Sequence, residues 1–127
     1  MQYRNGEAAV SHDFVLNGKR FRPVSNSKSG RVASDALFTF SQSGEAFSAT
    51  YSGAGFTDGH LIGQMTGTDQ AVLIYHSRAE DGSLEAGEAT AVFSEVKNGS
   101  ILIDMDWRWL NGSKAFGTSQ YQEIVNE

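Results

Sequence analysis

Alternating aromatic residues are the part of this sequence best suited to hold a ligand. Trp107 and Trp109 stand two residues apart, and Tyr51 and Tyr75 lie in two other apolar segments. Large flat side chains stack on ligands in barrel cavities, although aromatic stripes on strands often do no more than fill a core. We therefore predict that these four residues form a ligand-binding wall, with a filled core as the alternative.

Arg22 is the basic residue whose position best suits a ligand contact. It stands between Phe21 and Pro23 in a short segment. If Arg22 points inward near a barrel mouth, its guanidinium could hold a carboxylate or phosphate through two parallel hydrogen bonds. An internal salt bridge or a solvent-facing side chain would explain the residue equally well. We include Arg22 among the predicted ligand-binding residues as a polar anchor.

Two carboxylates with regular spacing raise the question of catalysis. Asp104 and Asp106 would lie about 7 Å apart on one face of a strand, a separation that could suit paired acid–base groups. Arg108 extends the same row. A charged ladder on the outer face explains all three residues more simply. We predict no catalytic residue.

The histidines and the lack of cysteine argue against metal and thiol chemistry. His12, His60 and His76 do not have the spacing of a metal-binding motif, and only a fold-dependent meeting of His60, His76 and a carboxylate could build a site. A sequence without cysteine excludes disulfides, thiolate metal sites and thiol catalysis. We predict neither a metal nor a cofactor.

The residues from 100 to 112 indicate which kind of element positions the tryptophans. Every second residue from Ile101 to Trp109 is apolar, and those between are mostly charged. Side chains alternate across a β-sheet, so this period of two predicts a half-buried strand that ends at the Asn111-Gly112 turn. Its inner face would carry Met105 and both tryptophans.

Turn-forming pairs divide the rest of the chain into segments of strand length. Glycine follows Asn, Asp or Ser at intervals from residue 17 to residue 112, where the chain can reverse direction. Segments of about 8 to 12 residues between such turns are typical of an all-β barrel or sandwich. Besides the 100–112 segment, we predict strands at residues 20–25, 36–42, 45–52, 60–66, 71–78, 84–94 and 114–124, and a turn at 53–59.

Eight strands with short connections favour an eight-stranded antiparallel meander β-barrel, because closing the sheet removes both unpaired edges. A β-sandwich is the alternative. The chain would form one domain over residues 1–127, with 1–13 as a loose lead-in. Small residues of one parity, at 87, 89 and 91 and at 115, 117 and 119, would leave space beside the tryptophans. A three-residue hairpin loop would place Trp107 opposite Ala115, and a two- or four-residue loop would place it opposite Phe116.

Composition and charge argue against several classes of partner. A net charge of -5 with scattered Lys and Arg argues against nucleic-acid binding. No apolar run approaches the roughly 20 residues of a membrane helix. The N-terminus lacks the apolar core of a signal peptide, so we expect a cytoplasmic protein.

Several short motifs resemble those of a known family. They are G-K-R-F-R-P-V-S-N-S at 18–27, A-T-Y-S-G at 49–53, G-H-L-I-G at 59–63, Y-H at 75–76, and W-R-W at 107–109 with G-T-S at 117–119. They resemble a family of small bacterial avidin-like or lipocalin-like β-barrel proteins often labelled "N-acetylglutamate synthase". The resemblance covers residues 18–124 and implies a barrel. Acetyl transfer from coenzyme A would need a site for a large phosphorylated cofactor, and no phosphate-binding loop followed by a helix occurs here.

These observations predict a barrel that binds a small apolar or aromatic ligand inside and performs no catalysis. Two alternatives stay open. A cyclase- or isomerase-like enzyme would use the cavity as a water-poor reaction chamber and would need ionisable groups pointing inward. A structural module would self-associate as a homodimer through an exposed strip containing Leu102 and Leu110.

Overall fold

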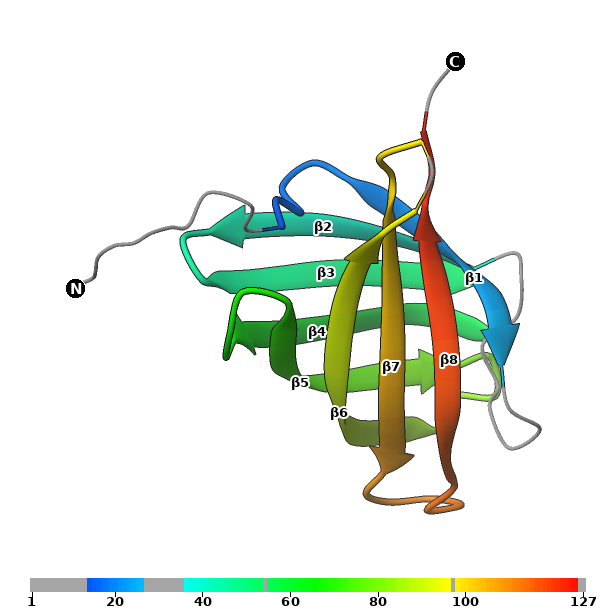
Figure 1. Cartoon of the computed structure of the whole chain (residues 1–127). Helices are drawn as coiled ribbons and strands as arrows, with labels where there is room; N and C mark the ends of the chain where they lie inside the picture. The colour runs from blue at the N-terminus through cyan, green and yellow to red at the C-terminus, as the bar shows by residue number, and fades with distance from the viewer. Residues whose placement is uncertain (1–13, 27–35, 54, 97, 126–127) are drawn as a thin grey trace.

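The chain folds as a closed barrel of eight antiparallel strands in a computed structural model that describes residues 14–26, 36–53, 55–96 and 98–125. The strands are β1 (Arg20–Asn26), β2 (Leu37–Ser43), β3 (Ala46–Gly53), β4 (Phe56–Met65), β5 (Gln70–Ala79), β6 (Leu84–Glu95), β7 (Ile101–Trp109) and β8 (Phe116–Glu123). Strands β2–β5 cross behind the upright β6–β8 (Figure 1), and β1 closes the barrel on β8. The predicted meander barrel is confirmed, and the sandwich alternative is wrong.

Strict alternation determines which side chains enter the barrel. Along β5 and β7 every second residue is buried and those between are exposed or half-buried. Met105, Trp107 and Trp109 face inward opposite Ala91, Ala89 and Gly87 of β6, as the sequence predicted. Small residues therefore lie beside large ones across the β6–β7 pair, which lets the indole rings occupy the interior.

Strand β4 begins earlier than predicted. The turn expected at 53–59 is shorter, because Phe56 already pairs with Gly53 of β3 and with Ala79 of β5. Register shifts on both sides of this segment mark β-bulges, which a strand pattern read from sequence does not reveal. The bulges bring the buried Phe56 side chain into the barrel.

The β7–β8 hairpin has a register that none of the predicted loop lengths provides. Trp107 lies opposite Gly117, and the Trp109 backbone N–H donates to the Ala115 carbonyl over 2.8 Å. The wider turn contains Lys114, with φ 55°. The Asn111 side chain ties this turn to β6, where it accepts from the Ala86 N–H over 2.8 Å. Asn111, which the sequence predicted as part of a tight turn, therefore uses its side chain in a tertiary contact with β6.

Residues 14–19 fill one end of the barrel. Leu16 is fully buried, and its N–H donates to the Gln42 side-chain oxygen over 2.6 Å. The Phe14 ring lies 5.8 Å from that of Phe93. We call this the phenylalanine end; its buried rings are Phe21, Phe40, Phe47 and Phe93. The predicted lead-in at 1–13 lies outside the described residues.

The opposite end is surrounded by the β3–β4, β5–β6 and β7–β8 connections. We call it the tyrosine end; its buried residues include Tyr51, Tyr75, Ser77, Trp107, Trp109 and Ser119.

The described part of the chain contains no helix with the length and apolarity needed to cross a membrane.

Candidate ligand-binding cavity

A small cavity lies inside the barrel at the tyrosine end. Its volume is about 40 Å³. The side chains that line it come from six strands: Phe38, Tyr51, Phe56, Leu61, Leu73, Tyr75, Met105, Trp107, Trp109 and Tyr121. The four aromatic residues that the sequence singled out all lie on this one cavity.

The lining rings pack mostly edge to face. Tyr75 and Trp109 have ring centroids 4.9 Å apart at 87°, and Tyr51 and Phe56 have centroids 6.1 Å apart at 88°. Phe38 and Tyr51 stack at 4.6 Å. Such arrangements are favourable for the ring quadrupoles, so the walls are stable without a ligand.

Hydrogen bonds hold three of the lining side chains in fixed orientations. The Trp107 indole N–H donates to the Ser119 hydroxyl over 2.7 Å, and the Tyr75 hydroxyl donates to the Arg108 carbonyl over 3.0 Å. The hydroxyls of Tyr51 and Ser77 lie 2.5 Å apart. These bonds turn the polar atoms toward protein partners and leave ring faces and aliphatic groups around the cavity.

Two glycines make room for the tyrosine rings. A Cβ at Gly59 would overlap the Tyr51 ring, and one at Gly87 would overlap the Tyr75 ring. Both pairs are cross-strand neighbours, Tyr51 with Gly59 and Tyr75 with Gly87. Gly87 was predicted to leave space beside the tryptophans, but the Tyr75 ring occupies that space. In a sequence, an aromatic residue placed to pair with a glycine on the next strand is the pattern that would predict such a covered glycine.

The cavity lining contains no side chain that is charged near neutral pH. Its ten lining residues include no carboxylate, imidazole, ammonium or guanidinium group. Burial raises the pKa of Tyr51 to about 12 and that of Tyr121 to about 12, and it raises the pKa of Tyr75 as well. All three phenols are therefore neutral near pH 7 and are poor general bases there.

Arg22 lies apart from the cavity. Its side chain is exposed on β1, while Phe21 and Pro23 on either side are buried. Of the alternatives that the sequence left open for Arg22, the structure has the solvent-facing side chain, because β1 alternates normally here and its register shifts only between Pro23 and Ser25. The four aromatic residues therefore meet without the predicted polar anchor.

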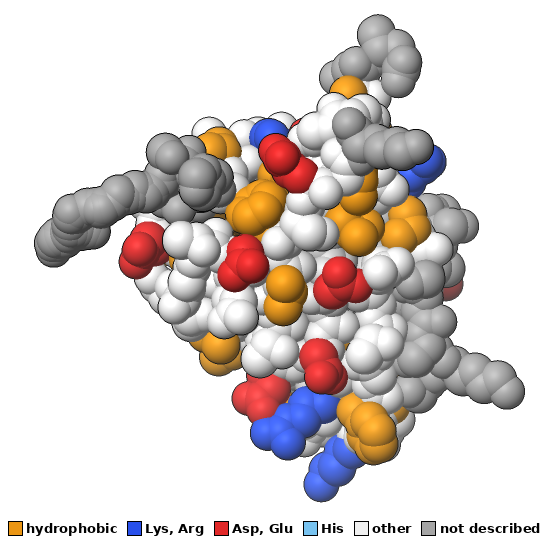
Figure 2. Space-filling model, viewed as in Figure 1, with side chains coloured by type: hydrophobic (Ala, Val, Ile, Leu, Met, Phe, Trp, Pro, Cys, Tyr) orange, Lys and Arg blue, Asp and Glu red, His pale blue; other side chains and the backbone are white. Residues whose placement is uncertain are grey.

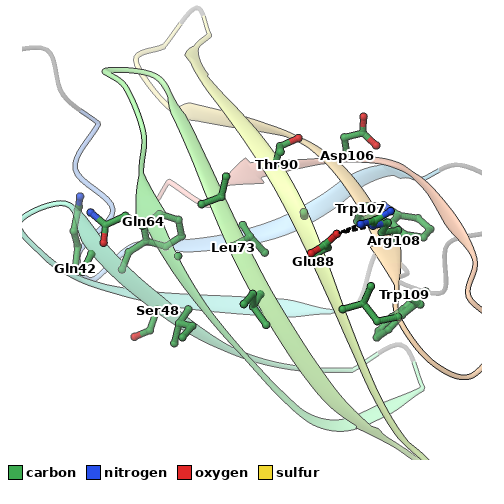
Figure 3. Close-up of a pocket in the computed structure, with 18 of the residues that line it drawn as sticks. Gln42, Ser48, Gln64, Leu73, Glu88, Thr90, Asp106, Trp107, Arg108 and Trp109 are labelled. Carbon is green, nitrogen blue, oxygen red and sulfur yellow. Dashed lines mark hydrogen bonds and ion pairs between the residues drawn. The ribbon is translucent and has the colours of Figure 1, made fainter.

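A wide hollow on the outer surface extends from β2 across β3–β6 to β7 and is open to solvent (Figure 3). Asp106 and Arg108 lie on it, as predicted for a charged outer ladder. Arg108 is paired with Glu88, whose carboxylate accepts from the Arg108 Nε over 2.6 Å. Because this hollow does not exclude water, the internal cavity is the better candidate for an apolar ligand.

The predicted self-association strip on β7 is not continuous. Leu102 is only half exposed and Leu110 lies past the far end of the strand, with charged side chains on the same face between them. Over the face formed by β6–β8, acidic groups are scattered among the apolar ones (Figure 2). A larger apolar cluster lies on β4–β6 instead and consists of Ile62, Val72, Ile74 and Val92.

Comparison with known proteins supplies one match. A family model described as "avidin-like protein" matches residues 14–124. No curated protein and no solved structure matches the chain. The matched range includes all eight strands and every residue of the internal cavity.

Proposed function

Because this chain belongs to the avidin-like protein family, we propose that its barrel binds a small apolar or aromatic molecule at the tyrosine end. Binding of small ligands such as biotin is the activity of that family. The observation that carries the proposal is the meeting of Tyr51, Tyr75, Trp107 and Trp109 on one internal cavity. Aromatic walls with their polar atoms already satisfied favour flat apolar groups.

The size of the cavity limits what enters. About 40 Å³ holds little more than one or two water molecules, whereas pockets for drug-sized ligands measure roughly 300–1,000 Å³. A ligand therefore inserts a small group, or it displaces lining side chains. Met105 is the best candidate for displacement, because an unbranched thioether changes rotamer more easily than a hydrogen-bonded indole.

Fluorescence of Trp107 and Trp109 tests the proposal directly. The protein is titrated with biotin, indole, benzene and a short fatty acid, and binding should quench or shift the emission. Met105→Ala enlarges the apolar cavity, so it should bind benzene or indole more tightly than the wild type. Val72→Ala, on the outer face of β5, is the matched control and should leave binding unchanged. Failure of both the wild type and Met105→Ala to respond to any of the four compounds would contradict the proposal.

Catalysis is less well supported than binding. The enzyme alternative needs ionisable groups that point inward, and the cavity lining supplies only tyrosine phenols with raised pKa values. A neutral phenol can donate a hydrogen bond but cannot accept a proton near pH 7.

A second proposal is a homodimer formed through the outer face of β4–β6. Ile62 and Ile74 are cross-strand partners there and are 55% and 56% exposed. An exposed apolar cluster of this kind is typical of an association surface. Light scattering should report a dimer for the wild type and a monomer for Ile74→Lys. Leu110→Lys, a change in the strip that the sequence predicted, should leave the dimer intact; a monomeric wild type would remove this proposal.

A further inference from the structure

Two of the three histidines meet on the outer surface of the barrel. His60 of β4 and His76 of β5 are cross-strand partners, although they are separated by fifteen residues in the sequence. Their ring centroids lie 5.4 Å apart with an interplanar angle of 64°. Their spacing in the sequence does not match a metal-binding motif, so only the fold brings the two imidazoles together. They meet on two strands that are hydrogen-bonded on both sides, which holds the backbone separation constant.

From this geometry we infer that His60 and His76 together bind one transition-metal ion. Two imidazoles bound to one ion at about 2.0–2.1 Å have ring centroids about 4.5 Å apart at the square-planar angle typical of Cu(II) and about 5 Å apart at a tetrahedral angle. The observed 5.4 Å is close to these separations, so modest side-chain rotation is enough to bring one nitrogen of each ring onto a shared ion. Imidazole suits Cu(II), Ni(II) and Zn(II), and Cu(II) binds most tightly of the three.

The neighbours of the pair leave it accessible. Thr50 lies opposite His60 on β3, and Ala86 lies opposite His76 on β6, so short side chains flank both rings. The pair lies in an outer hollow that also contains the charged residues Asp58, Arg78 and Glu85. An ion can therefore reach the rings from solvent without any movement of the backbone.

The protein supplies two ligands, and exchangeable ligands complete the coordination. Within the described ranges no group of three or more His, Cys, Asp or Glu residues could hold a metal ion. The same hollow contains the carboxylates of Asp58 and Glu85, and Asp58 accepts a hydrogen bond from the Arg78 Nε over 3.1 Å. Water molecules or an added ligand occupy the remaining positions, so the site resembles an open chelate rather than a closed structural site.

Titration with Cu(II) alone tests the inference on the intact chain. Calorimetry should give one ion per chain, and the electron paramagnetic resonance spectrum should show two nitrogen donors. His60→Gln and His76→Gln should each weaken binding at least about tenfold, because each removes one of two ligands. Equal affinity in the wild type and either variant, a single nitrogen donor, or no binding by the wild type would overturn the inference.

Two controls show whether a loss of affinity arises from the two imidazoles themselves. His12→Gln removes the remaining histidine and should leave Cu(II) affinity unchanged; a loss equal to that of the other variants would overturn the assignment. The melting temperatures of His60→Gln and His76→Gln without metal should match the wild type within a few degrees, because His76 is exposed and His60 half-buried. Since the pair lies on the outer face, this test does not depend on whether the internal cavity binds a ligand.

Discussion

The two ends of the barrel contain aromatic rings of similar size but differ in how those rings are held. At the phenylalanine end, Phe21, Phe40, Phe47 and Phe93 pack ring against ring in the same buried cluster as Leu16, and their side chains have no polar atoms. At the tyrosine end, hydroxyl and indole groups hold the rings through directional bonds to Ser77, Ser119 and the Arg108 carbonyl. The first arrangement fills space, whereas the second fixes rotamers around a small cavity.

This difference bears on where the proposed ligand would enter. A ring held only by dispersion has no preferred partner once its neighbours move, so the phenylalanine end serves as a core. A ring held by a hydrogen bond keeps its orientation when one neighbour is displaced, which preserves the shape of a binding wall. Changes of pH and single substitutions at either end should expose the difference, beginning with the largest expected effect.

Alkaline pH should destabilise the folded protein through the buried tyrosines of the cavity. Burial raises the pKa values of Tyr51 and Tyr121 to about 12, against about 10 in an unfolded chain. Between pH 10 and 12 the unfolded state loses these protons and the folded state retains them, so stability present below pH 10 is lost as pH rises. The two residues together account for about 5 kcal/mol over this range. Urea unfolding of the wild type and Tyr51→Phe at pH 8 and pH 11.5 measures the loss in the free energy of unfolding. An identical loss in both proteins would contradict the expectation.

Truncation at the phenylalanine end should be the most damaging single substitution. Phe21 is fully buried and lies 5.1 Å from the Phe40 ring. Phe21→Ala leaves a cavity that rigid strands cannot close, and we expect a loss of about 3–5 kcal/mol in the free energy of unfolding. Urea denaturation measures the loss, and ligand titration should show no change in affinity at a temperature where the variant is folded. A loss below about 1 kcal/mol would mean that this end is loosely packed.

Added volume at Gly87 should disturb the tyrosine end specifically. A Cβ there would overlap the Tyr75 ring and the Arg108 carbonyl. Gly87→Ala should therefore cost about 1–3 kcal/mol and should shift the fluorescence of Trp109, which packs edge to face on Tyr75. Gly67→Ala is the matched control, because its nearest neighbour is 4.0 Å from the added Cβ. Equal effects of the two substitutions would contradict the close approach of Tyr75.

Removing one hydroxyl should have the smallest effect. Ser77→Ala deletes the hydroxyl 2.5 Å from that of Tyr51 and should cost about 1 kcal/mol. It should also raise the pKa of Tyr51 further, because the bond to Ser77 favours the ionised phenol. Spectrophotometric titration of the tyrosines follows this shift. A lower midpoint of the tyrosine titration in Ser77→Ala would show that the bond to Ser77 raises the pKa of Tyr51 instead of lowering it.

Much of the fold and part of the cavity follow from local pattern. The alternation in residues 101–109 determined which face of β7 is buried, and the positions of turn-forming glycines determined the number of strands. The same alternation placed Tyr51, Tyr75, Trp107 and Trp109 on inner faces. For Arg22 the neighbouring residues in sequence left the direction of the side chain open, and the parity of β1 turns it outward.

Which face of each strand a side chain occupies follows from local sequence, because consecutive side chains on a strand point to opposite faces whatever the partner strand does. The register between strands does not, because it depends on bulges and on contacts such as that of Asn111 with β6. Register in turn placed Tyr75 over Gly87 and His60 beside His76. The cavity volume has the same origin, because it is the small space that remains after side chains from all eight strands have packed.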